Sequence, residues 1–178
     1  MSVDILKYFA TRRMDPWKAE AAVFTSYSGG VDLLDPDPET IDIRDIAQSL
    51  NRINRYNGHT EIPLTVAQHS CNLYDYVKHS REFLRPIDFL LHDAAEAYTG
   101  DIVTPLKRLI APIIGPIERG LLSAIYVKFG LSEPDWQLIS EVEKEHFPLD
   151  FQSGFTGSPG SDSRWMRLTL GELTGFTG

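Results

Sequence analysis

The chain has 178 residues and a mass of 20.1 kDa, the size of one ordinary domain, and 42% of its residues are hydrophobic, enough for a core. Its 17 basic and 25 acidic residues give a formal net charge of −8. This balance excludes the basic footprint of a nucleic-acid-polymer binder and disfavours an anionic membrane as partner. The single cysteine, Cys71, excludes a disulfide framework and a cysteine-based zinc site.

The sequence predicts a soluble cytoplasmic protein. No stretch approaches 18 apolar residues, so no membrane span is expected. Residues 1–9 lack the basic and apolar regions of a signal peptide. One cysteine also suits a reducing compartment.

Helical periodicity recurs along the chain, whereas strand-type alternation is weak throughout. The turn-rich segments 26–30 and 35–39 are expected to be loops. The expected helices run from about 42 to 56, from a Thr65 N-cap through at least 77, from 86 to a stop at Gly100, and over about 116–129, 134–147 and 165–173.

These elements predict an all-α fold, a compact helical bundle. We expect one domain over residues 1–178, with its core at about 24–150. The tail, 151–178, is expected to be a loop followed by a short helix.

The segment from His92 to Asp101 carries an unusual density of ionisable groups for an apolar helix. His92 and Asp93 are adjacent in its middle, and Glu96 follows at helical spacing on the same or an adjoining face. Asp101 stands just beyond the Gly100 stop. Buried ionisable groups are costly unless they are paired or bind a metal. The segment therefore predicts a metal site, with a buried salt-bridge network as the alternative.

His69 lies on the apolar face of the preceding helix. Helices joined by a short connection usually pack antiparallel, so His69 can approach His92 and Asp93. Two imidazoles and a carboxylate with open positions suit Mn, Fe, Co, Ni or Zn better than Ca. Taken alone, a histidine on an apolar face such as His69 is more often a core histidine than a metal ligand.

The strings VAQHS (66–70) and HDAAEAYTGD (92–101), preceded by RINRYNGHTEIPLT (52–65), resemble the HD-domain metal-dependent phosphohydrolase superfamily. Within it they are similar to the 5′-deoxynucleotidases and to small phage-type dATP triphosphohydrolases. The resemblance covers residues 24 to about 145. It implies one divalent transition metal, Zn, Co or Mn, with Mg as a further possibility.

The resemblance also implies a ligand set. His69, His92 and Asp93 match the first three ligands, and the fourth is an Asp on a later helix in that superfamily. Here the best-aligned position is Glu143. Three other acidic residues, or a water molecule, remain open as alternatives: Glu141, Glu145 and Asp150.

By the same resemblance, Glu96 and Asp101 form a catalytic acid/base pair beside the metal. Arg55 is the first choice for binding the substrate phosphate. The further substrate-binding candidates are Arg52, His59 and Lys107. The ordinary alternatives are solvated helix charges for the two arginines and a turn residue for His59.

The expected function is metal-dependent hydrolysis of 2′-deoxynucleotides, with dATP and other deoxyadenosine phosphates giving deoxyadenosine and phosphate or polyphosphate. One alternative is a 5′-deoxynucleotidase that accepts dNMPs with several bases. Another is a non-catalytic HD module that binds nucleotide or metal. The expected partners are a small nucleotide and further copies of the chain, and neither a nucleic-acid polymer nor a membrane.

Overall fold

Helices form most of the chain, which confirms the predicted all-α class. The computed structural model describes residues 21–60, 62–153 and 161–174, of which 147–153, 161–164, 166, 167 and 174 are described by their backbone alone. The elements are β1 (Ala22–Val23), β2 (Val31–Asp32), η2 (Pro38–Thr40), α2 (Ile43–Leu50), η3 (Arg55–Gly58), α3 (Val66–Ser80), α4 (Pro86–Leu91), α5 (Glu96–Thr99), α6 (Thr104–Lys128), α7 (Trp136–Ser153) and α8 (Ser161–Thr174).

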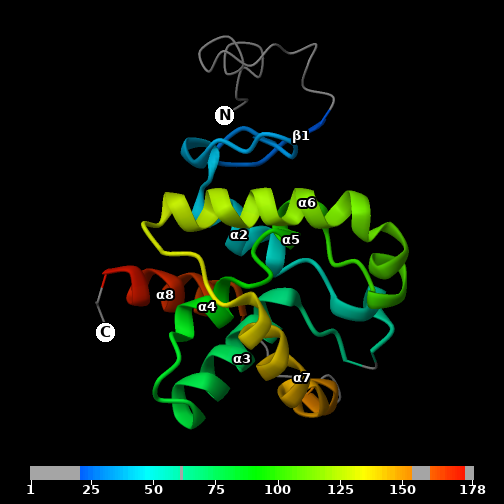
Figure 1. The fold of residues 1–178 in the computed structure, drawn as a ribbon, viewed down its shortest axis with the longest axis vertical. Coiled ribbons are helices and arrows are strands. Elements are labelled where there is room, and N and C mark those ends of the chain that lie inside the picture. Colours follow the sequence, from blue (N-terminus) through cyan, green and yellow to red (C-terminus); the bar gives the residue numbers. More distant parts are fainter. Residues whose placement is uncertain (1–20, 61, 154–160, 175–178) are drawn as a thin grey trace.

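The helices pack around α3 and α2. Helix α3 packs on α4, α7 and α8, and α2 packs on α5 and α8. The strands β1 and β2 form a short antiparallel hairpin, with Val23 opposite Val31. Figure 1 shows this hairpin at one end of the molecule above α6, and α3 and α7 toward the opposite end.

A small cluster of buried side chains, separate from the main core of the bundle, fixes α7 against α3 and α4. Ile139 and Val142 of α7 pack with Leu73 and Val77 of α3 and with Phe89 of α4. Because Ile139 and Val142 face this cluster, the turn of α7 that follows is held at a fixed position beside α3.

The predicted N-cap of α3 is confirmed, since the Thr65 hydroxyl accepts a hydrogen bond from the Gln68 N–H at 3.1 Å. The helix expected over 42–56, in contrast, ends at Leu50. Beyond it, Asn54 pairs with Thr65 in an isolated antiparallel bridge, which draws the chain out of the helix. Tyr56 and Asn57 then adopt left-handed backbone conformations, with φ of 57° and 53°.

The helix expected from Pro86 to Gly100 is split into α4 and α5 by a turn at His92–Ala95. In this turn the bonds run from residue i to i−3: the Ala94 N–H donates to the Leu91 carbonyl at 2.9 Å, and the Glu96 N–H to the Asp93 carbonyl at 3.0 Å. Tightened winding of this kind changes the angle between successive side chains. Sequence periodicity alone did not reveal it.

Helix α6 begins at Thr104, twelve residues before the expected start, with Pro105 in its first turn. Lys107 and Glu118 form an ion pair of 2.9 Å although eleven residues separate them. In a straight helix they would be about 16 Å apart along the axis. The helix therefore bends between them, where Pro112 and Pro116 lie inside it.

Among the described residues, α6 is the one helix that could cross a membrane by length and composition. The sequence expectation had excluded any such stretch. A single helix of this kind is weak evidence for a membrane location. In its most apolar stretch of 18 residues, 28% of the stretch is buried within the protein.

The two C-terminal helices run beyond their predicted limits. Helix α7 continues to Ser153, past the expected end at 147, and α8 begins at Ser161 and not at 165. Helix α8 joins the main core through Trp165, which is fully buried and donates its indole N–H to the Leu90 carbonyl at 3.1 Å. The residue whose carbonyl it binds lies two positions before His92.

We expect Trp165→Ala to lower the free energy of unfolding by about 3–5 kcal/mol, because the change empties a large core site and leaves the Leu90 carbonyl without its donor. Urea denaturation followed by far-UV circular dichroism measures this. Leu170→Ala, on an exposed part of the same helix, is the control and should change the value by less than about 0.5 kcal/mol. Equal effects of the two changes would contradict the assignment of Trp165 to the core.

Candidate metal centre

Two imidazoles and two carboxylates converge where α3, α7 and the α4–α5 turn meet. His69 comes from α3, His92 and Asp93 come from the turn, and Glu143 comes from α7. One possible ligand atom from each of the four lies within 4.8 Å of all the others. The cluster therefore has the composition and the spacing needed to hold a metal ion.

The individual distances place the ring nitrogens against the carboxylate oxygens. Nε2 of His92 lies 3.1 Å, and Nε2 of His69 3.5 Å, from Oδ2 of Asp93. His69 Nε2 also lies 3.8 Å from Oε1 of Glu143, and the two Nε2 atoms are 3.2 Å apart. Four donor atoms of this kind around a common point can all be satisfied at once by one cation.

The orientation of His92 is set by a hydrogen bond on its other nitrogen. Nδ1 lies 2.8 Å from the Phe89 carbonyl. A carbonyl only accepts, so Nδ1 carries the proton and the lone pair of Nε2 points toward the cluster. Metal-binding histidines typically make this second contact, which supports His92 as a ligand.

The four side chains of the cluster differ in their exposure to solvent. The side chains of His69 and Glu143 are 2% and 36% exposed, respectively. The His92 side chain is also buried, and that of Asp93 is mostly so. Glu143 is therefore the most exposed of the four side chains.

Arg55 adds positive charge at the same place. Its Nη1 donates to Oδ2 of Asp93 at 3.1 Å, and its Nη2 lies 3.7 Å from Oε1 of Glu143. The left-handed turn of η3 follows directly, and the carboxylate of Asp101 accepts a hydrogen bond from the Tyr56 N–H at 3.1 Å. Asp101 thus ties the end of α5 to the turn that carries Arg55.

Glu96 lies buried beside the cluster with incomplete hydrogen bonding. Lys107 Nζ is 3.7 Å from its Oε1, while its Oε2 has no hydrogen-bond partner among the residues described. Burial raises the pKa of Glu96 well above its usual value, and the carboxylates of Asp93 and Asp101 raise it further. Burial likewise raises the pKa of Asp101, against the opposing effect of Arg55. Both carboxyls therefore hold a proton more readily than a solvent-exposed carboxyl does, and Glu96 more so than Asp101.

Asp93 behaves in the opposite way. Burial acts to raise its pKa, but the His92 ring outweighs this effect, with His69 and Arg55 contributing, and holds the pKa of Asp93 far below its usual range. Asp93 thus stays ionised, as a metal ligand must. The site combines an ionised carboxylate with two carboxyls whose pKa values are raised.

The structure brings together the four residues that the sequence assigned to the metal. Of the alternatives to Glu143, Glu141 accepts a hydrogen bond from Gln137, and Glu145 pairs with Arg81 on the protein surface. The side chain of Asp150 lies outside the described residues.

The four substrate-binding candidates, unlike the four metal-ligand candidates, do not all lie at one place. Arg55 lies at the cluster and Lys107 beside Glu96, whereas Arg52 lines a separate cavity between the hairpin turn and α2. His59 is exposed at the end of η3, where its backbone N–H donates to the Tyr56 carbonyl. Glu118, the partner of Lys107, was not among the residues expected from the sequence. Only the prolines that bend α6 could have indicated that Glu118 approaches Lys107.

The chain is similar to two curated proteins, both named as uncharacterized. One, from Rhodobacter capsulatus, is 35% identical over 106 residues, which cover 57% of this chain and 54% of that protein. The other, the Escherichia coli K12 protein YfdR, is 40% identical over 93 residues, which cover 52% of this chain and 49% of that protein. The matched region thus spans about half the length of each relative. No model of a known protein family matches the chain.

Glu143→Ala is expected to weaken metal binding by at least about 100-fold, since losing even an outer hydrogen-bond partner of a metal ligand costs 10–100-fold. Titration of the metal-free protein with Zn²⁺, Co²⁺ or Mn²⁺, checked by elemental analysis, measures this. Glu141→Ala, two residues away on the same helix, is the matched control and should bind as the wild type does. If Glu141→Ala loses the metal and Glu143→Ala keeps it, the fourth ligand is misassigned.

Proposed function

We propose that this chain is a metal-dependent phosphohydrolase of the HD type that acts on 2′-deoxynucleotides. The observation that carries the proposal is the meeting of His69, His92, Asp93 and Glu143 at one point, with Arg55 at its edge. A buried carboxyl, Glu96, lies within reach of Lys107 beside it. Metal ligands, an arginine and a proton-holding acid are the groups that phosphate-ester hydrolysis requires.

The donor set suits one divalent transition metal. Two imidazole nitrogens and two carboxylate oxygens favour Zn²⁺, Co²⁺ or Mn²⁺, with Mg²⁺ a weaker fit. A metal bound here would polarise a phosphoryl oxygen and lower the pKa of a water molecule.

The chain's own residues then have separable tasks. The Arg55 guanidinium offers planar N–H donors to phosphoryl oxygens at the edge of the cluster. Glu96, buried and favouring its protonated form, holds the proton that the leaving oxygen needs. Asp101 keeps the Arg55 turn in place through the Tyr56 N–H and, as the second carboxyl, orients the attacking water. Lys107 limits the build-up of negative charge beside Glu96.

Our preferred substrates are dATP and other deoxyadenosine phosphates, cleaved to deoxyadenosine and phosphate or polyphosphate. The support for this choice is the similarity of the segment 52–70 and of HDAAEAYTGD to deoxynucleotide hydrolases. Hydrolysis of dNMPs with several bases is the alternative within the same chemistry.

Purified protein, loaded in turn with Mn²⁺, Co²⁺, Zn²⁺ and Mg²⁺, should hydrolyse deoxynucleotides, and the products identify the reaction. The assay offers all dNMPs, dNTPs, NMPs and NTPs and separates the products by ion exchange. Tripolyphosphate from dATP supports the preferred reaction, and orthophosphate from dNMPs supports the alternative. Failure to turn over any nucleotide with any of the four metals would refute the enzyme proposal.

Glu96→Gln should lower the turnover rate by about 10²–10⁴-fold, the usual contribution of a general acid, because the amide cannot donate a carboxyl proton. Metal content should remain equal to that of the wild type, since Glu96 lies outside the ligand cluster. Steady-state kinetics and elemental analysis of the same samples test both halves. Loss of metal from Glu96→Gln would instead make Glu96 part of the metal site.

We further propose a soluble cytoplasmic enzyme that works as a homo-oligomer on a small-molecule substrate. Exposed apolar side chains on the first half of α6, Leu106, Leu109 and Ile113, support self-association. The net charge of −8 supports a small substrate over a nucleic-acid polymer or an anionic membrane.

A further inference from the structure

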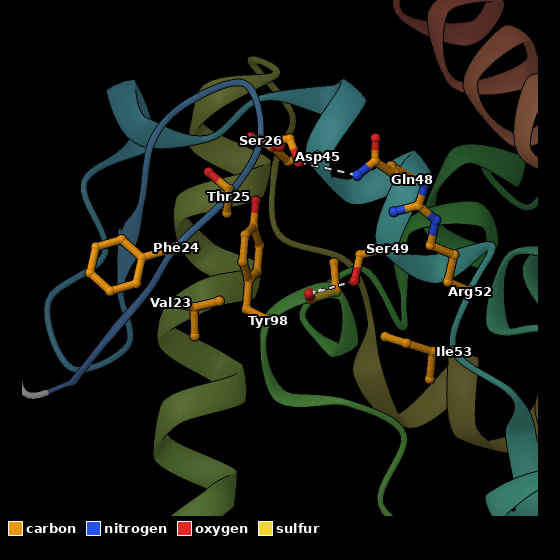
Figure 2. A pocket seen from close by; sticks show the side chains of 11 residues that line it. Val23, Phe24, Thr25, Ser26, Asp45, Gln48, Ser49, Arg52, Ile53 and Tyr98 are labelled. Atoms are coloured by element: carbon orange, nitrogen blue, oxygen red, sulfur yellow. Dashed lines mark hydrogen bonds between the residues drawn. The ribbon is translucent and has the colours of Figure 1, made fainter. Parts of the chain in front are cut away.

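A second cavity, separate in its lining from the metal centre, lies between the hairpin turn, α2 and α5 (Figure 2). Its volume is about 260 Å³, just below the usual range for small-molecule sites, which favours a compact ligand. None of its lining residues belongs to the four-residue metal cluster. It nevertheless includes Ala97 and Tyr98, which follow Glu96 on α5.

The cavity has an apolar side and a polar side. Val23 and Ile53 lie along one side, and Ser26 and Gln48 along the other (Figure 2). The Gln48 amide donates to the Ser26 hydroxyl at 3.2 Å, so a hydrogen-bonded pair faces the space. Such a lining fits a ligand that combines a flat apolar face with polar edges.

Tyr98 brings a hydroxyl that the protein leaves unsatisfied. The residue is only 7% exposed, and its hydroxyl is buried with no hydrogen-bond partner in the part of the chain that the structure describes. In Figure 2 the ring points its oxygen toward the polar side of the cavity. Because buried hydroxyls are costly without a partner, this atom indicates that something else supplies an acceptor.

Arg52 supplies a cation to the lining of this cavity. Its guanidinium forms no ion pair with any residue described. The acid in the cavity wall, Asp45, is already engaged, since its two oxygens accept the backbone N–H groups of Tyr27 and Ser28, each at 2.9 Å. Arg52 therefore remains available to an anion, and its planar donors suit a phosphate.

We propose that this cavity is a second ligand site, which takes a nucleoside monophosphate. The phosphate pairs with Arg52 at the open side, the base lies against Val23 and Ile53, and an acceptor on the base receives the Tyr98 hydroxyl. A nucleoside monophosphate is a compact ligand of the kind that a cavity of about 260 Å³ favours. The choice of a nucleotide rests on the proposed function, whereas the cavity, the unpaired arginine and the unsatisfied hydroxyl do not.

The test is calorimetric titration of the full-length protein with dAMP, AMP and inorganic phosphate in the presence of a chelator, which prevents turnover and metal-dependent binding. We expect a nucleotide to bind without metal and to bind more tightly than inorganic phosphate does. Arg52→Gln should weaken that binding about 10-fold or more, the usual value of a hydrogen bond to a charged group, and Tyr98→Phe about 3–10-fold. Because the Tyr98 hydroxyl has no partner among the described residues, Tyr98→Phe should leave the melting temperature of the ligand-free protein unchanged or raised.

Two controls assign the binding to this cavity. Arg44→Gln removes an arginine of α2 that pairs with Asp42 and does not line the cavity, and it should leave affinity unchanged. Arg55→Gln removes the arginine of the metal centre and should also leave the metal-free affinity unchanged. Binding that is lost with Arg55 but not with Arg52, inorganic phosphate binding as tightly as either nucleotide, or no metal-free binding of dAMP and AMP would each overturn the proposal. Turnover by the metal-loaded wild type is measured separately, so the proposed function can fail or hold independently.

Discussion

Two carboxylates cannot lie together in a protein interior without compensating positive charge, and this constraint governs the arrangement around Asp93 and Glu143. Each lies within 4 Å of the His69 ring and of the Arg55 guanidinium. Those partners come from segments far apart in the sequence, so the cluster forms only when α3, α7 and the Arg55 turn are all in place. The apolar packing of the bundle holds these elements at that spacing.

Three local features position the residues of this cluster. The Thr65 cap fixes where α3 begins, and therefore where His69 lies along it. The tightened turn after α4 lets two adjacent residues, His92 and Asp93, contribute to one cluster. Ile139, packed one turn before Glu143, sets the approach of α7. In each case a local conformation or contact is held in place by the packing of the helices, as is typical of sites built on rigid elements.

Local spacing was enough to group His92, Asp93 and Glu96, because all three lie within five residues. It was not enough for the two arginines. On the continuous helix expected over 42–56, Arg52 and Arg55 are three residues apart and would share a face. The bridge between Asn54 and Thr65 ends the helix first, so Arg55 reaches the metal cluster and Arg52 the second cavity. A non-local backbone pairing of this kind leaves no periodic signal in the sequence. Glu143 was located through resemblance, since its distance along the chain carries no geometric information.

The uneven exposure of the four donors has a kinetic consequence. An ion that leaves a site does so one ligand at a time, beginning with the donor that water can most easily replace. Here that donor is Glu143, the most exposed of the four, on the longer of the two acidic side chains and on a helix that packs through a small cluster. His69 and His92, which are buried, would release a bound ion last. Exchange of an ion held by these four residues would thus depend on the attachment of α7, and mutations that loosen α7 would accelerate metal loss without changing any of the four residues.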